Sequence, residues 1–265
     1  SEITWVPADK IRAAAKILGD NKPHYSWNGM GSEQLTDSIH VLQARFILAT
    51  ITGSLDVPGG VHVGGPGLVR GIPEISAMDK LSDAQKAKQM GADKFKFQSW
   101  PGYKIILENS MKFWNHLPSS EQTLAASPHQ PSLYRAMIDG KPYPIKGVIT
   151  LAHNPMVTQA NTKLVYKALK SVDIHVVLDY WMTPSAELAD YVLPAASGWE
   201  RPFFMFSYAG DQAVPEKIEG EYDHKIDYDI FRELGIRMGQ DWPQETLEEM
   251  YDWQLEPIGM TFKQL

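Results

Sequence analysis

Cysteine is absent from the 265-residue sequence. A chain without thiols forms no disulfides, has no thiolate zinc site or Cys nucleophile, and cannot itself hold an iron–sulfur cluster. Its eight histidines are scattered and form no HxH or HExxH pair. The sequence therefore predicts no metal site made by this chain alone.

Long apolar runs and a surplus of basic charge are also missing. No apolar run reaches the roughly 18 residues that a membrane-spanning helix needs, and the first residues have neither the basic start nor the apolar block of a signal peptide. The 25 basic residues are outnumbered by 32 acidic ones, giving a net charge of −7. We therefore expect no nucleic-acid partner and no direct membrane insertion.

Three common signatures are missing as well. There is no GxxxxGK[ST] phosphate loop and no GxSxG nucleophile turn. The nearest approach to GxGxxG begins Gly29-Met30-Gly31 and has Gln34 where the third glycine is needed. These absences exclude a P-loop nucleotidase, an esterase-type hydrolase and a standard dinucleotide fingerprint.

What is present is clearest in the second half of the chain. Continuous apolar runs predict strands at residues 147–152, 174–178 and 191–193, and helical spacing predicts helices at 161–170 and 184–189. Strand, helix, strand, helix and strand of these lengths form a βαβαβ unit. The fold class expected is α/β, a three-layer Rossmann-like parallel sheet with flanking helices and a helical excursion.

The chain is expected to have three segments. Residues 1–71 form a helix–strand–helix segment that ends in a glycine-rich loop, 72–145 an irregular helical excursion broken by prolines, and 146–265 the βαβαβ region with C-terminal helices. The other elements expected are a strand at 23–27, a loop or edge region at 203–221, and helices at 8–19, 32–52 (with Ser32 as N-cap), 83–90, 103–116, 228–238 and 244–255. The buried face of the helix at 32–52 is expected to carry Ile39, Leu42, Phe46, Ile47 and Ala49.

Candidate ligand-binding residues follow the ends of the strands, where open parallel sheets bind ligands. The first strand ends at His153-Asn154-Pro155, and the second ends at Asp179, 26 residues after His153. This spacing is like that of the ribose-binding acid of dinucleotide folds, although Asp179 could equally cap the following helix. The glycine run from Gly59 to Gly65 fits either a phosphate cradle or a flexible connection.

Two blocks of residues together resemble the molybdopterin oxidoreductases, the dimethyl sulfoxide reductase superfamily. Three positions depart mildly from the family pattern: Trp181 replaces the usual Phe, Ser185 the usual Thr, and Ser54 the usual Asn. The later block is Asn154-Pro155, Val176 to Ala196 and Glu200, and the earlier block is Gly29-Met30-Gly31-x-x-Gln34 followed by Leu48 to Gly60.

The resemblance implies a cofactor, two molybdopterin guanine dinucleotides around one molybdenum or tungsten atom. Asp179 would bind a guanine or ribose edge, and Thr183 with the Asn154-Pro155 turn would line the same slot. Residues of the earlier block would approach the pterin or the phosphates. The cofactor-binding residues implied are Met30, Gly31, Gln34, Ser54, Gly59, Gly60, His153, Asn154, Pro155, Asp179, Thr183 and Ser185.

The resemblance also implies that this chain is the central part of a longer protein, the large subunit of an oxidoreductase of anaerobic respiration. Family members carry an N-terminal segment that can hold a 4Fe-4S cluster, a metal ligand upstream of the matched region and a C-terminal barrel. Without them we expect this piece to be inactive, with no catalytic residue of its own. Its expected partners are the rest of its large subunit and an iron–sulfur electron-transfer subunit.

Two other readings remain open at this point. The chain fits a non-catalytic cofactor-binding module or a degenerate structural subunit of the same fold, and an ordinary nucleotide-binding α/β protein outside the family. The sequence leaves the substrate, the choice of Mo or W, and a cytoplasmic or periplasmic location open.

Overall fold

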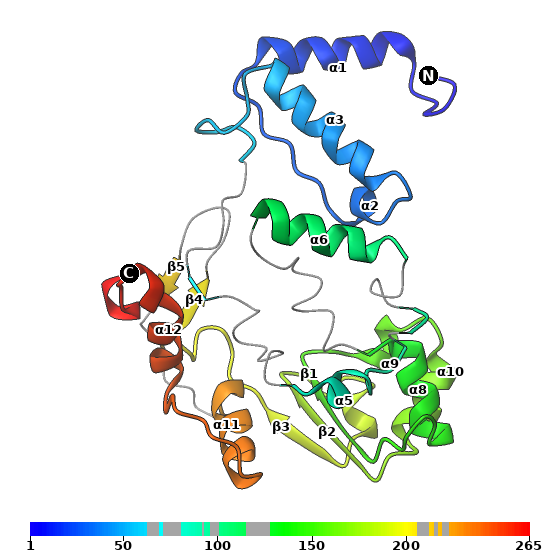
Figure 1. Cartoon of the computed structure of the whole chain (residues 1–265), viewed down its shortest axis with the longest axis vertical. Coiled ribbons are helices and arrows are strands. Elements are labelled where there is room, and N and C mark those ends of the chain that lie inside the picture. Colours follow the sequence, from blue (N-terminus) through cyan, green and yellow to red (C-terminus); the bar gives the residue numbers. More distant parts are fainter. Residues whose placement is uncertain are drawn as a thin grey trace. The chain divides into compact units, whose positions relative to one another are not determined.

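A computed structural model describes residues 1–62, 69–70, 81–91, 93–95, 101–114, 128–205, 212–214, 217–218 and 223–265. The chain divides into two compact units, Ser1–Pro66 and Gly67–Leu265. Figure 1 labels the elements of both. The three-segment division expected from the sequence stays a prediction.

A parallel sheet forms the centre of the second unit. Its strands are β1 (Gly147–Leu151), β2 (Ile174–Asp179) and β3 (Tyr191–Pro194), in the order β1-β2-β3 (Figure 1). Helix α10 (Thr162–Leu169) connects β1 to β2, and a short 3-10 turn, η4 (Ala186–Leu188), precedes β3. The βαβαβ prediction is confirmed, with the second helix reduced to η4.

One face of this sheet is covered by α10 together with α8 (Gln130–Asp139). The core between them consists of Tyr134, Met137, Val165, Ala168 and Leu169. Helix α8 lies within 72–145, where an irregular helical excursion was expected, and it packs on the core beside the sheet. Its proline stands in the first helical turn, where no intrahelical N–H bond is lost, so it helps to start the helix.

The opposite face is covered in part by α11 (Asp227–Arg237). Ile230, Phe231 and Leu234 of this helix face the sheet across an apolar cavity of about 440 Å³. Helices on both faces confirm the α/β class. The cover is incomplete, since Ile149 of β1 and Ile174 of β2 remain 44% and 43% exposed.

A second core forms around α12 (Leu247–Leu255), whose cap Thr246 accepts a hydrogen bond from the Glu249 amide at 3.2 Å. Tyr251 and Leu255 pack there with Phe262, next to the 3-10 turns η5 (Glu256–Ile258) and η6 (Phe262–Gln264). The segment expected as a loop or edge contains an antiparallel pair, β4 (Phe203–Met205) and β5 (Gln212–Val214).

Replacing Gly235 with alanine should lower the free energy of unfolding, although alanine is normally the better helix former. A Cβ at Gly235 would lie 2.9 Å from Cε3 of Trp242, whose indole N–H donates to Tyr228 Oη at 3.0 Å. Such overpacking costs about 1–3 kcal/mol. Denaturant unfolding measures the change. Gly198→Ala is the matched control because nothing lies within 4 Å of that position, and equal stability of both variants would contradict this packing.

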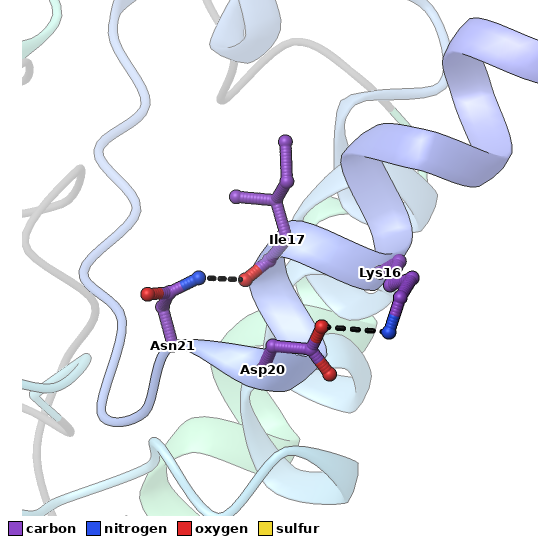
Figure 2. Close-up of polar contacts among 4 residues, drawn as sticks. All are labelled: Lys16, Ile17, Asp20 and Asn21. Atoms are coloured by element: carbon purple, nitrogen blue, oxygen red, sulfur yellow. Dashed lines mark hydrogen bonds and ion pairs between the residues drawn. The ribbon is translucent and has the colours of Figure 1, made fainter.

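The first unit contains α1 (Ala8–Asp20), α2 (Met30–Glu33) and α3 (Ser38–Ile51). The helix over 8–19 is confirmed and extends by one residue. At the end of this helix, the side-chain nitrogen Nδ2 of Asn21 donates to Ile17 O at 2.8 Å, and Lys16 pairs with Asp20 at 2.8 Å (Figure 2). These side-chain contacts end the helix one residue beyond Gly19.

Two expectations for the first unit are wrong. Residues 23–27 form no strand, and the helix expected at 32–52 is two helices with a break before Ser38. The Ser32 hydroxyl donates to Gly29 O at 3.0 Å within the first of these, so it caps nothing. The apolar face expected on α3 is largely uncovered, since Ala49 is buried while Ile39 and Ile47 are 69% and 61% exposed.

Two short helices complete the described chain. Helix α5 (Asp83–Lys86) has a capping box between Ser82 and Gln85 and is shorter than the expected 83–90. Helix α6 (Tyr103–Trp114) agrees with the expected 103–116 as far as Trp114, and the last two positions lie outside the described residues. Among the described residues, no helix has the length and apolar character needed to cross a bilayer.

Candidate functional site

The carboxyl ends of the three parallel strands share one edge of the sheet, where α/β folds bind ligands (Figure 1). Leu151 at the end of β1 is paired with Leu178, and Asp179 at the end of β2 is paired with Pro194. The later block of candidate residues therefore gathers at this edge.

Ser185 ties the end of β1 to the turn after β2. Its hydroxyl donates to the Asn154 side-chain oxygen at 2.7 Å and accepts from the Met156 amide at 3.1 Å. The Ser185 side chain is fully buried, and its bond holds the Asn154 side chain in place. This bond uses one of the two lone pairs of the Asn154 oxygen, so Asn154 can offer a ligand its NH₂ group and the second lone pair.

Asp179 does not cap the following helical turn. Its Oδ1 accepts from the Trp181 amide at 3.1 Å, whereas the Thr183 hydroxyl accepts from the Ala186 amide at 3.2 Å, in the turn that leads into η4. Of the two roles that spacing left open for Asp179, capping of the following helical turn is not the one that its bond to Trp181 serves. The carboxylate is partly exposed and keeps unused acceptor capacity at the strand end.

His153 and Pro155 belong to the turn after β1. Pro155 is buried and begins α9 (Pro155–Thr158). His153 Nε2 lies 2.9 Å from the Thr158 hydroxyl, so this imidazole bonds to the helix that follows it. The backbone enters the turn through Ala152, which has φ +46° and whose amide donates to Leu178 O at 3.1 Å.

The earlier block lies in the first unit. Met30, Gly31 and Gln34 are exposed on α2 and at its end, and a Cβ at Gly31 would meet nothing within 4 Å. This leaves an open surface without a side chain, the kind of place where a flat ligand can approach backbone.

Ser54 and Gly60, by contrast, are buried within their own loop. The Ser54 hydroxyl accepts from the His24 amide at 3.1 Å and from the Thr52 hydroxyl at 3.2 Å. A Cβ at Gly60 would lie 2.2 Å from Ser54 O. These two residues hold the loop together, while Gly59 is exposed with φ +80°.

Sequence reasoning missed His175, which is 1% exposed in β2. Its Nε2 lies 3.0 Å from the Thr150 hydroxyl, and its amide donates to the Asp190 carboxylate at 2.7 Å. Burial lowers the pKa of this imidazole, outweighing the Leu188 carbonyl and the Asp190 carboxylate, which raise it. Only its place in an apolar strand marks it in the sequence, and that pattern does not distinguish a buried polar residue.

The free energy of unfolding should therefore decrease as the pH is lowered and His175 becomes protonated. A group whose pKa is lower in the folded state stabilises above its unfolded pKa, and this contribution is lost as the pH falls below about 6.5. His175→Gln removes the titration. Its free energy of unfolding should change less between about pH 7 and pH 5, where one group contributes at most about 1.4 kcal/mol per pH unit. Identical pH slopes for both proteins, measured by denaturant unfolding, would contradict this.

A second polar cluster lies near the end of β3. Glu200, part of the later block, is 3.3 Å from His224. The Ser197 backbone and side chain lower the pKa of this carboxyl, and His224 adds to the effect. A neighbouring cavity of about 420 Å³ is lined by His224 and by Lys225, which pairs with Glu233 at 2.7 Å. The charges here compensate one another within the protein.

The donor set at the sheet edge suits a nucleotide better than a metal ion. Among the described residues, no three His, Asp or Glu side chains gather in a way that could hold a metal ion. Asp179 offers a carboxylate acceptor and Asn154 an amide donor, next to the backbone turns that end β1 and β2. A purine with paired N–H donors, or a ribose with vicinal hydroxyls, is complementary to such groups.

The fold is thus α/β, with polar side chains gathered at the carboxyl ends of its parallel strands. The family model described as molybdopterin oxidoreductase matches residues 11–237. The chain therefore belongs to the molybdopterin oxidoreductase family, and the cofactor that this family implies is a molybdopterin with molybdenum or tungsten. The resemblance seen in the two sequence blocks is confirmed.

Individual relatives agree with this assignment. Acetylene hydratase of Syntrophotalea acetylenica is 30% identical over 276 residues, covering 100% of this chain and 37% of that protein. The F420-dependent formate dehydrogenase 2 subunit alpha of Methanococcus maripaludis is 29% identical over 277 residues, again 100% of this chain and 37% of that protein. The solved structure of acetylene hydratase from Pelobacter acetylenicus matches with a TM-score of 0.74 and 28% identity, over 97% of this chain and 36% of that chain.

This chain thus spans little more than a third of the length of these relatives. They are named as a hydratase and as a dehydrogenase subunit, so one scaffold serves different reactions. Membership of the family supports an enzyme that carries this chain as one part, and the relative named as subunit alpha is a subunit of an assembly.

Proposed function

We propose that this chain is the region that binds the guanine dinucleotide part of the cofactor in a longer molybdenum- or tungsten-dependent oxidoreductase. The observation that carries the proposal is the place of Asp179. It stands at the carboxyl end of β2 as a partly exposed carboxylate, at the sheet edge where the turn after β1 carries an Asn154 side chain fixed by buried Ser185. The full cofactor would be the bis-molybdopterin guanine dinucleotide form.

In this proposal Asp179 accepts the paired N–H donors of guanine or the hydroxyls of the ribose. The amide of Asn154 donates to an acceptor of the same nucleotide. Thr183 keeps the turn after β2 in place through its bond to Ala186, and Pro155 and His153 shape the turn after β1. When bound, the metal of the cofactor supplies the redox or group-transfer chemistry. The chain's own residues bind and orient the nucleotide.

The earlier block would act on a different part of the cofactor. Met30, Gly31 and Gln34 present an exposed surface without a side chain at position 31, which suits the pterin or the phosphates. Gly59 would approach the cofactor with its backbone. Ser54 and Gly60 would contribute by keeping the loop folded, since both are buried.

The partner proposed first is the rest of the same large subunit. Ile149, Leu151 and Ile174 leave one sheet face partly exposed, and an apolar face of this kind is normally covered in an α/β fold. The relatives have ample further length to cover it. The catalytic metal ligand and any 4Fe-4S cluster would come from that remainder, so we expect this piece to be inactive alone. An iron–sulfur electron-transfer subunit is the second proposed partner.

The mass and metal content of the native gene product test this function. We expect a chain considerably longer than 265 residues that carries about one Mo or W per molecule, measured by intact mass and elemental mass spectrometry. A native protein of 265 residues without either metal would contradict the proposal and favour a non-catalytic module of the same fold.

A further inference from the structure

The residue two positions after the proposed nucleotide-binding carboxylate is an exposed tryptophan, Trp181. Trp181 is 74% exposed, and its neighbours Tyr180 and Met182 are also largely exposed. A large aromatic side chain in water forgoes the stabilisation that burial would give it. The part of the chain that the structure describes therefore gives no packing reason for an indole at this position.

The backbone of Trp181 is nevertheless held on both sides. Its amide donates to Asp179 Oδ1 at 3.1 Å, and its carbonyl accepts from the Thr183 amide at 2.8 Å. Thr183 is in turn fixed by its bond to Ala186 in η4. The starting point of this side chain is thus set by the same carboxylate that is proposed to bind the nucleotide.

A purine base needs two kinds of contact. The edge of the base carries hydrogen-bond donors and acceptors, and a carboxylate can accept bonds from the donors. The two faces of the base are π-surfaces, on which aromatic side chains stack. Asp179 supplies the first kind of contact at the end of β2. Trp181, whose backbone amide donates to that carboxylate, carries an exposed indole that can supply the second.

We propose that Trp181 stacks on the base whose edge Asp179 binds, and so determines how tightly the nucleotide end of the cofactor is held. This inference rests on the proposed function, because it needs a purine at this edge of the sheet. Since every base has a π-face, stacking adds affinity without choosing between bases, and Asp179 remains the residue that selects guanine.

Variants at Trp181 in the native holoenzyme test the proposal. Trp181→Phe keeps an aromatic face, Trp181→Leu keeps apolar volume without one, and Trp181→Ala removes both. The control is Trp199→Leu, a change at an equally exposed tryptophan that follows β3 and has no bond to Asp179. The readouts are the GMP released by acid from each purified protein and the rate at which the cofactor is lost during dialysis, with thermal unfolding as a check on folding.

We expect Trp181→Leu and Trp181→Ala to lose the cofactor about ten- to a hundred-fold faster, and Trp181→Phe and Trp199→Leu to stay near the unsubstituted protein. If Trp181→Leu loses the cofactor as slowly as Trp181→Phe does, the proposal is overturned. An aromatic face would then not be needed, and apolar packing against the protein would account for the tryptophan at this position. Retention by Trp181→Ala would overturn the proposal as well. The proposed function has its own test: retention of the cofactor by Asp179→Ala would contradict it, whatever the Trp181 variants show.

Discussion

Replacing Asp179 with alanine in the native enzyme should remove most of the guanine nucleotide held at this strand end, one of the two that the proposed cofactor carries, and with it most of the metal. A hydrogen bond to a charged group contributes about 1.5–3 kcal/mol, so the loss of even one weakens binding roughly ten- to a hundred-fold. Among the residues that the structure describes, the Asp179 side chain bonds to the Trp181 amide alone, so its removal changes the ligand site more than the fold. GMP content and Mo or W content per chain measure the effect.

The control for this prediction lies at the other end of the same strand. Asp173 precedes β2 and is paired only loosely with Lys146, at 3.8 Å on the surface. Asp173→Ala should leave both contents unchanged, because exposed ion pairs contribute little. Asp179→Asn keeps the shape but replaces an acceptor with a donor, so it should also lose guanine. Normal GMP content in Asp179→Ala would show that the carboxylate does not bind the nucleotide.

Replacing Gly60 with alanine should unfold the loop between Ser54 and Val61. The new Cβ would meet Ser54 O at 2.2 Å, and this oxygen cannot move away freely because it accepts from the Val61 amide at 2.7 Å. The Gly60 amide is bonded to Val57 O at 2.8 Å, which restricts the glycine too. We expect a cost of about 3 kcal/mol, at the upper end for overpacking.

Limited proteolysis of this loop, together with thermal unfolding, measures the effect of Gly60→Ala. Gly29→Ala is the matched control in the same unit, since nothing lies within 4 Å of that position and its φ of −138° suits any residue. Cleavage in the loop should become faster for Gly60→Ala alone. Equal cleavage rates for the two variants would mean that Gly60 is not needed to close the loop.

The sheet could be predicted from sequence because its signals are local and agree with one another. The apolar runs over β1, β2 and β3 lie between helix or turn signals, and each became a strand within one residue of its expected bounds. The helix at 161–170 has its own cap, since the Asn161 side chain accepts from the Leu164 amide at 3.1 Å. In this part of the chain, the local sequence signals for strands and helices agree with the structure that the whole fold adopts.

The first unit was harder to predict because its signals conflict. Ser32 is a good N-cap residue type, yet its hydroxyl donates to Gly29 O and the helix around it ends after Glu33. Apolar residues of α3 such as Ile39 and Ile47 suggested a buried face, although both stay exposed. Periodicity predicts that a face is apolar, but it does not say what covers that face.

The candidate site was predicted only in part for a similar reason. Strand ends locate Asp179 and Asn154 in the sequence, and the structure places both at one edge of the sheet. The roles of Ser185, which fixes Asn154, and of buried His175 depend on contacts across the fold that no spacing reveals. Whether these residues bind the cofactor stays a prediction until the nucleotide is measured.

The nucleotide bound by the native gene product tests the central claim most directly. Acid treatment of the purified protein, followed by chromatography of the released nucleotides and metal analysis of the same sample, gives the amount of GMP per Mo or W. A bis-molybdopterin guanine dinucleotide predicts two GMP for each metal atom. Metal without GMP, or another nucleotide in its place, would contradict the assignment of Asp179 as a guanine-binding residue.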